Sequence, residues 1–190
     1  MRIITGSARG VALKTLEGEA TRPTAEKVKE AVFSALQFDL EGRRFLDLFA
    51  GSGQMGLEAL SRGAAHATFI DASREAMEIV KANARKTGFF DSSHFLVSDF
   101  RSYLRKAKGA ERFHIVFIDP PYAERLVGEC LKRLLEADLL TPSALVVTES
   151  EESDVFAACP EMQKVFDVIK EKKYGRSFIH ILRVKDGNEA

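Results

Sequence analysis

The residues Asp119-Pro120-Pro121-Tyr122 place a carboxylate, two prolines and an aromatic ring in one short stretch. They follow the apolar run 113–118, which is typical of a buried strand. The carboxylate and a backbone carbonyl can accept the protons of an amino group, and the tyrosine can stack on a flat ring. The two prolines restrict the backbone that holds these groups. The stretch therefore suits a flat ring that bears an amino group, although a Pro-Pro pair after a strand also serves as a chain breaker.

A glycine loop lies earlier in the chain, between a predicted strand and a predicted helix. Gly51-Ser52-Gly53-Gln54-Met55-Gly56 fits the pattern G-x-G-x-x-G, and Asp71 ends the next predicted strand. This combination is the usual fingerprint of a dinucleotide site, so it predicts a cofactor that contains adenosine. An NAD-linked oxidoreductase is one interpretation, but the chain has no obvious catalytic His, Lys or Tyr-x-x-x-Lys arrangement.

Asp47, at the end of the strand before this loop, favours S-adenosylmethionine over NAD. A pyrophosphate binds backbone N–H groups at a helix N-terminus and gains nothing from a nearby carboxylate. S-adenosylmethionine has no phosphate, and its methionine end is cationic, which suits Asp47. We expect Asp71 to accept hydrogen bonds from the ribose hydroxyls and Asp99-Phe100 to contact the adenine edge and face.

Three acids, Asp47, Asp71 and Asp99, end three consecutive predicted strands. They are expected to form one row along the carboxyl edge of the sheet, where open α/β folds bind ligands. Asp119 ends the fourth predicted strand and is expected to place a substrate beside the cofactor.

Strand-like and helix-like segments alternate from residue 44 onward. Ser73 is a good N-cap for a helix that we expect to end at Thr87, before Gly88. Such alternation predicts a mostly parallel sheet with helices on both faces. The predicted strands are 44–49, 67–70, 94–97, 113–118 and 144–149, the predicted helices are 54–62, 73–87, 100–108, 124–137 and a short one near Val155, and an antiparallel pair is expected over 165–170 and 178–184.

The first 43 residues differ from the rest. Segments 2–5 and 11–14 predict a small basic hairpin, and Thr24 is expected to cap the helix that follows. The predicted division is an extension over 1–43, a main domain over 44–185 and a disordered tail over 186–190.

The composition is that of a soluble globular protein: 190 residues, 45% hydrophobic and 29% charged. No apolar stretch approaches the roughly 20 residues that span a bilayer, and no signal peptide is recognisable, so we expect a cytoplasmic protein without membrane contact. Cys130 and Cys159 are expected to be core thiols. The four histidines are scattered, so no metal site is predicted.

The formal net charge is zero, but the charges are unevenly distributed. The stretch 136–161 contains acidic residues and no Lys or Arg, while basic residues gather near the start, middle and end of the chain. A neutral total can therefore hide a basic surface that binds phosphates. Arg9, Lys14 and Arg22 are candidates for phosphate contacts.

Two motifs carry a family resemblance. The stretch 47–53, Asp-Leu-Phe-Ala-Gly-Ser-Gly, resembles motif I of class I S-adenosylmethionine-dependent methyltransferases. The stretch 119–122 resembles motif IV of the branch that methylates exocyclic amino groups of bases. Nearly the whole chain resembles the bacterial 16S rRNA guanine-N2 methyltransferases of the RsmD type, through residues 1–6, 21–24, 30–33, 57–64 and 174–175. Small departures occur at Gln54-Met55 and Arg176-Ser177.

The resemblance implies a Rossmann-like fold with a seven-stranded, mostly parallel sheet and an antiparallel last strand. It implies methyl transfer from S-adenosylmethionine to the N2 amino group of a guanine in 16S rRNA, within the small ribosomal subunit or an assembly intermediate. S-adenosylhomocysteine would be the other product, no metal would take part, and a monomer is expected. The implied catalytic residues are Asp119, Pro120, Pro121 and Tyr122, and the implied cofactor contacts include Arg22, Thr24, Phe49, Gly51 and Gly53.

Two alternatives share some of these features. A DNA adenine-N6 methyltransferase can use the same tetrapeptide, but the chain contains no separate domain for DNA target recognition. A non-catalytic RNA-binding module would not need the row of acids. The tetrapeptide alone does not select guanine over adenine, or RNA over DNA.

Overall fold

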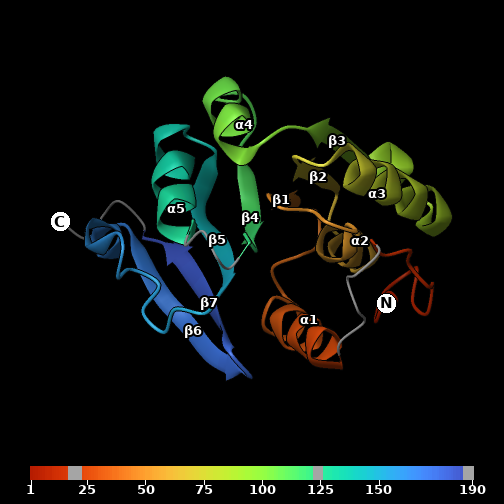
Figure 1. The fold of residues 1–190 in the computed structure, drawn as a ribbon, viewed down its shortest axis with the longest axis horizontal. Helices are drawn as coiled ribbons and strands as arrows, with labels where there is room; N and C mark the ends of the chain where they lie inside the picture. The colour runs from red at the N-terminus through yellow and green to blue at the C-terminus, as the bar shows by residue number, and fades with distance from the viewer. Residues whose placement is uncertain (17–22, 122–125, 186–190) are drawn as a thin grey trace. The chain divides into compact units, whose positions relative to one another are not determined.

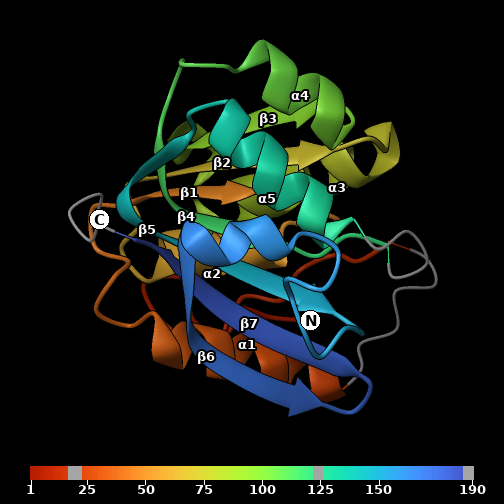
Figure 2. The same ribbon diagram turned by 90° about the vertical axis from the view of Figure 1, so that its left-hand side faces the viewer.

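A computed structural model describes residues 1–16, 23–121 and 126–185. These residues belong to two compact units, Met1–Asp99 and Phe100–Ala190 (Figures 1 and 2). Arg22, Tyr122 and the predicted tail 186–190 lie outside the described residues. The predicted division of the chain at residue 43 stays a prediction.

The first unit contains a parallel sheet of three strands in the order β3-β2-β1. Helices α2 and α3 connect these strands and pack against them. The register aligns Asp47 with Phe69 and Asp71 with Val97, so the strands end at one common edge. The elements are β1 (Arg44–Asp47), α2 (Gln54–Ser61), β2 (His66–Asp71), α3 (Arg74–Thr87), the short 3-10 helix η1 (Phe90–Ser92) and β3 (Ser93–Val97).

Helix α3 begins and ends as its sequence predicts. The Ser73 side chain accepts a hydrogen bond from the Ala76 N–H at 3.1 Å, which satisfies a donor of the first turn. At the other end Gly88 has a φ of 80°, a left-handed conformation that favours glycine. The β2–α3 connection is therefore short and well defined, and it holds Asp71 at the strand end.

The N-terminal part of this unit differs from its prediction at the start of its helix. Helix α1 (Pro23–Ala35) begins at Pro23, so Thr24 lies in its first turn and is not the N-cap. Proline is favourable at a first helical position because that position needs no N–H donor. The predicted hairpin is present: Arg2 and Ala12 form an antiparallel bridge, flanked by backbone hydrogen bonds between residues 1–3 and 10–13.

The second unit contains four strands in the order β4-β5-β7-β6. β4 (Phe113–Ile118) and β5 (Leu140–Ser150) are parallel, and β7 (Ser177–Val184) runs antiparallel to β5 and to β6 (Phe166–Tyr174). Helices α4 (Phe100–Lys106) and α5 (Val127–Glu136) lie side by side (Figure 2).

The short helix predicted near Val155 is wrong in position. Residues 155–158 form a turn, and the helical turn follows as the 3-10 helix η3 (Pro160–Lys164). Proline early in a helical segment favours this start because its φ is already fixed near the helical value.

The predicted α/β fold is confirmed, with a seven-stranded, mostly parallel sheet and an antiparallel last strand. The predicted strands and main helices are all present, with ends that differ by a few residues. Over the described ranges, no helix is both long and apolar enough to cross a membrane.

Candidate functional site

The glycine loop after β1 is held by two carboxylates. The Gly51 N–H donates to Asp71 Oδ2 at 2.8 Å, and the Gly56 N–H donates to Asp47 Oδ2 at 3.1 Å. Gly51 and Gly53 have φ values of 52° and 78°, which a residue with a side chain rarely adopts. The loop therefore presents bare backbone to any ligand at this edge.

The last glycine of the loop has a different task. A Cβ atom on Gly56 would lie 2.3 Å from Cε1 of Phe69, a buried ring on β2. Glycine at this position lets helix α2 pack closely against the sheet, as the third glycine of a G-x-G-x-x-G loop does.

Backbone hydrogen bonds join the residues that follow β1 and β3 to the end of β2. The Ala50 N–H donates to the Ile70 carbonyl at 2.8 Å, and the Ser98 N–H donates to the Asp71 carbonyl at 2.9 Å. Asp71 Oδ1 also accepts from the Ser73 N–H at 2.8 Å. The structure thus brings the predicted row of acids to one edge, with Asp71 half-buried and Asp99 exposed.

Asp47 is turned into the protein and is only 1% exposed. Burial raises the pKa of its carboxyl group to about 7; the hydrogen bond from Gly56 opposes this shift, and the nearby Asp71 charge adds to it. In the structure Asp47 holds the start of α2. Its predicted contact with the methionine end of a cofactor stays a prediction.

The burial of Asp47 makes the folding stability of the protein depend on pH. A carboxyl group whose pKa is raised on folding binds its proton more tightly in the folded state. Its contribution to stability is therefore present below pH 4 and is lost as the pH rises toward 7. We expect Asp47→Asn to gain stability relative to the unsubstituted protein over this window, by up to about 4 kcal/mol.

Urea unfolding of both proteins between pH 4 and 8 measures this difference. The replacement of the exposed Asp91 by asparagine is the matched control for the removal of one carboxylate. A stability difference for Asp47→Asn that does not change with pH would contradict the raised pKa.

The other residues predicted to contact the cofactor differ in their burial and in the elements to which they belong. Phe49 is half-buried, and Phe100 opens helix α4 with its side chain only 4% exposed. Thr24 lies in the first turn of α1. Their contacts with a cofactor, and those of Arg22, stay predictions.

The candidate phosphate contacts Arg9 and Lys14 are exposed on the N-terminal segment, which we define as residues 1–14. Buried polar side chains hold the backbone of this segment. Glu58 accepts from the Ile4 and Thr5 N–H groups at 2.8 and 3.0 Å. Ser61 Oγ accepts from the Ala8 N–H at 3.0 Å and donates to the Thr5 carbonyl at 2.6 Å.

The buried Glu58 is balanced by two cations. Lys29 Nζ lies 3.7 Å from Glu58 Oε2, and Arg62 Nε donates to Glu58 Oε1 at 2.8 Å. Lys29 and Glu58 are fully buried, and burial lowers the pKa of the Lys29 amine. Lys29 Nζ also donates to the Arg2 carbonyl at 2.6 Å, so the same cluster fixes the start of the chain.

Asn83 on α3 joins the N-terminal segment to the glycine loop. Its Oδ1 accepts from the Lys14 N–H at 2.8 Å, and its Nδ2 donates to the carbonyls of Lys14 and Ser52, both at 2.9 Å. Glu58, Ser61 and Asn83 were not predicted as functional residues from the sequence. The signal that could have identified them is a polar residue among the apolar positions of a helix.

We expect Asn83→Ala to lower the free energy of unfolding by about 2–4 kcal/mol, because one buried and two part-buried hydrogen bonds to the backbone are lost. The control is Lys86→Ala on the same helix, which removes an exposed hydrogen bond to Ala12 of the same segment and should cost less than about 1 kcal/mol. Urea unfolding measures both, and equal losses would contradict the role of Asn83.

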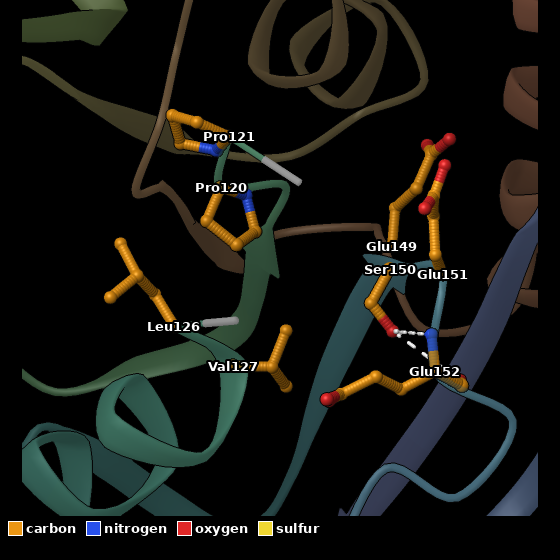
Figure 3. Close-up of a pocket in the computed structure, with 8 residues that line it drawn as sticks. All are labelled: Pro120, Pro121, Leu126, Val127, Glu149, Ser150, Glu151 and Glu152. Atoms are coloured by element: carbon orange, nitrogen blue, oxygen red, sulfur yellow. Dashed lines mark hydrogen bonds between the residues drawn. The ribbon is translucent and has the colours of Figure 1, made fainter. Parts of the chain in front are cut away.

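In the second unit, Asp119 directly follows β4 and is half-buried, Pro120 is buried and Pro121 is exposed. Beside the two prolines lies a cavity of about 200 Å³ (Figure 3). The sequence analysis did not predict its acidic residues. The lining consists of Pro120, Pro121, Leu126, Val127, Glu149, Ser150, Glu151 and Glu152.

Across the described residues, no three His, Cys, Asp or Glu side chains gather into a possible metal site. Cys130 and Cys159 are free and buried. The polar groups at the strand ends are mainly carboxylates and backbone groups. Such groups can form hydrogen bonds with hydroxyls, amines and rings that bear an amino group.

The parallel strands, the glycine loop after β1 and the antiparallel β7 define the Rossmann-like fold of class I methyltransferases. The solved structure of yhhF from Escherichia coli has this fold. It is 32% identical, covers 98% of each chain and superposes with a TM-score of 0.84.

Residues 1–183 match the family described as Conserved hypothetical protein 95, and the chain belongs to this family. Ribosomal RNA small subunit methyltransferase D of Haemophilus influenzae is 33% identical over 176 residues, which are 92% of this chain and 89% of the relative. The protein of the same name from Escherichia coli is 38% identical over 153 residues, 80% of this chain and 75% of the relative. The family resemblance seen in the sequence is thereby confirmed.

Proposed function

We propose that this protein transfers a methyl group from S-adenosylmethionine to the N2 amino group of a guanine in 16S rRNA of the small ribosomal subunit. The observation that carries the proposal is the identity of 33% and 38% with relatives named as small-subunit rRNA methyltransferases. The guanine N2 position rests on the sequence resemblance.

The glycine loop and its neighbours fit the proposed cofactor. Each oxygen of the Asp71 carboxylate accepts one backbone N–H and has a further lone pair for a ribose hydroxyl. Asp99 is exposed at the next strand end, where an adenine edge can approach it. When bound, S-adenosylmethionine supplies an electrophilic methyl group. Further predicted contacts are Arg22, Thr24, Phe49 and Phe100.

The reaction needs help because the amino nitrogen of guanine shares its lone pair with the ring and is a poor nucleophile. In our proposal the Asp119 carboxylate and the Pro120 carbonyl accept the amino protons. This increases electron density on nitrogen and stabilises the positive charge that develops during transfer. Holding the nitrogen in line with the methyl group that it attacks increases the rate further.

The base itself must leave its stack to enter such a site. Tyr122 is proposed to stack on the ring, a contact worth roughly 1–3 kcal/mol in other complexes of bases with aromatic residues. The amino proton is lost during or after transfer, and Asp119 is the proposed acceptor.

Titrations with two ligands test the proposed cofactor and the alternative of an NAD-linked oxidoreductase. Calorimetry should show binding of S-adenosylhomocysteine and no binding of NAD. Methyl transfer from labelled S-adenosylmethionine should then reach 16S rRNA, naked or in small subunits, and leave DNA unmodified. Tight NAD binding, or methylation of DNA alone, would contradict the proposal.

The N-terminal segment is proposed to contact RNA phosphates. We expect the double substitution Arg9→Glu, Lys14→Glu to weaken RNA binding about 10-fold or more at low salt. The salt dependence of binding should also become less steep, because fewer phosphate contacts mean that fewer counterions are released on binding. Arg112→Glu, which changes an exposed arginine in the second unit, is the control. Binding curves over a range of salt concentrations measure the effect, and unchanged curves would remove this role.

A further inference from the structure

We propose that Glu149 selects guanine, by accepting the N1–H proton of the same base whose amino group Asp119 holds. The inference rests on the proposed function. It assigns the choice of base, which the stretch 119–122 does not make, to a residue of the neighbouring strand.

The strand register brings the two carboxylates to neighbouring positions. β4 and β5 are parallel, and Ile118 is aligned with Thr148. Asp119 follows Ile118 directly after β4, Glu149 follows Thr148 within β5, and both are half-buried. Adjacent strands lie about 4.8 Å apart, and aligned residues point to the same face of a sheet. The two carboxylates therefore follow an aligned pair of residues at the carboxyl edge.

The cavity beside these strand ends has one apolar side and one acidic side (Figure 3). Pro120, Leu126 and Val127 form the apolar side, against which a flat ring can pack. Glu149 and Glu151 lie on the other side, and their side chains project in the same direction in this view.

The other two glutamates of the cavity are less suited to this task. Glu151 is exposed and faces a cation, since Arg176 Nε lies 3.7 Å from its Oε1. Glu152 projects toward Val127, away from the other two carboxylates (Figure 3), and its backbone is fixed by hydrogen bonds with Ser150 Oγ. Glu149 is the cavity residue that directly follows Thr148, the partner of Ile118 in the strand register.

The chemistry of the base edges explains the selection. Guanine presents N1–H and the N2 amino group as two adjacent donors, and an ionised carboxylate only accepts. Adenine presents an acceptor, N1, beside its amino group, so a carboxylate there would face a lone pair. A mismatch of this kind lowers recognition by roughly 10- to 100-fold.

The test uses 2-aminopurine, which keeps the amino group of guanine but has an unprotonated N1. The methylated guanine is first mapped with the unsubstituted enzyme. Small subunits are then assembled around 16S rRNA that carries guanine or 2-aminopurine at that position. We expect the unsubstituted enzyme to methylate guanine at least about 10-fold faster.

Glu149→Gln should slow methylation of guanine. It should also lower the ratio of the methylation rate on guanine to that on 2-aminopurine, because an amide N–H can donate to the N1 of 2-aminopurine. The fluorescence of 2-aminopurine, measured with S-adenosylhomocysteine present, reports entry of the base into the site independently of transfer. The fluorescence should be higher with Glu149→Gln than with the unsubstituted enzyme. Glu136→Gln, at the far end of α5 from the cavity, is the matched control and should behave as the unsubstituted enzyme.

If the unsubstituted enzyme forms no N2-methylguanosine, the proposed function fails. If it does, and Glu149→Gln keeps the original ratio between the two bases, the inference about Glu149 is overturned. Should Glu149→Gln not fold, Glu149→Asp replaces it. That variant keeps a carboxylate and must retain the preference for guanine while it reacts more slowly; a lost preference would equally overturn the inference.

Discussion

Replacing Asp119 by alanine is expected to slow methyl transfer by about 100- to 1,000-fold, the usual cost of losing a group that stabilises charge in a transition state. The carboxylate directly follows β4 and is half-buried, so no water can fully reproduce its fixed position. Single-turnover assays on small subunits with labelled S-adenosylmethionine measure the rate. Binding of S-adenosylhomocysteine should remain within about threefold, since Asp119 acts on the base.

The control for this experiment is Asp167→Ala, which removes an exposed carboxylate from β6 of the same unit. It should leave the rate unchanged. Full activity of Asp119→Ala would contradict the mechanism, and a large loss of cofactor affinity would show that Asp119 acts on the cofactor instead.

Replacing Asp71 by alanine is expected to weaken binding of S-adenosylhomocysteine by about 100-fold, because hydrogen bonds to a charged group each contribute about 1.5–3 kcal/mol. The substitution removes the proposed acceptor for the ribose hydroxyls. It also leaves the N–H groups of Gly51 and Ser73 without their carboxylate partners and so loosens the glycine loop. Calorimetry measures the affinity.

Asp71→Asn is a milder change because its amide oxygen keeps an acceptor at the position of one of the two carboxylate oxygens. We expect an intermediate affinity for it. Asp91→Ala, which changes an exposed acid before β3, is the control. Unchanged affinity in Asp71→Ala would remove the proposed ribose contact.

The sequence predicted those parts of the fold that local signals determine. Ser73 and Gly88 mark the ends of α3, and the structure has a cap and a left-handed glycine at these positions. The row Asp47, Asp71, Asp99 was predicted because parallel strands end at one edge. The direction of each side chain at that edge was not predictable, and Asp47 turns inward to hold Gly56.

The features that the sequence did not reveal depend on distant contacts. The N-terminal segment forms the predicted hairpin, but the sequence did not show that Glu58, Ser61 and Asn83 also hold its backbone. Helix α1 begins at Pro23, where the fixed φ of proline outweighs the capping preference of threonine. Glu149 gains its importance only from the alignment of β5 with β4.

The most direct test of the central claim is nucleoside analysis of 16S rRNA after reaction of small subunits with the purified protein and labelled S-adenosylmethionine. The account predicts that the label is recovered as N2-methylguanosine at a single position and that Asp119→Ala yields none. Label recovered as N6-methyladenosine, or transferred only to DNA, would contradict it.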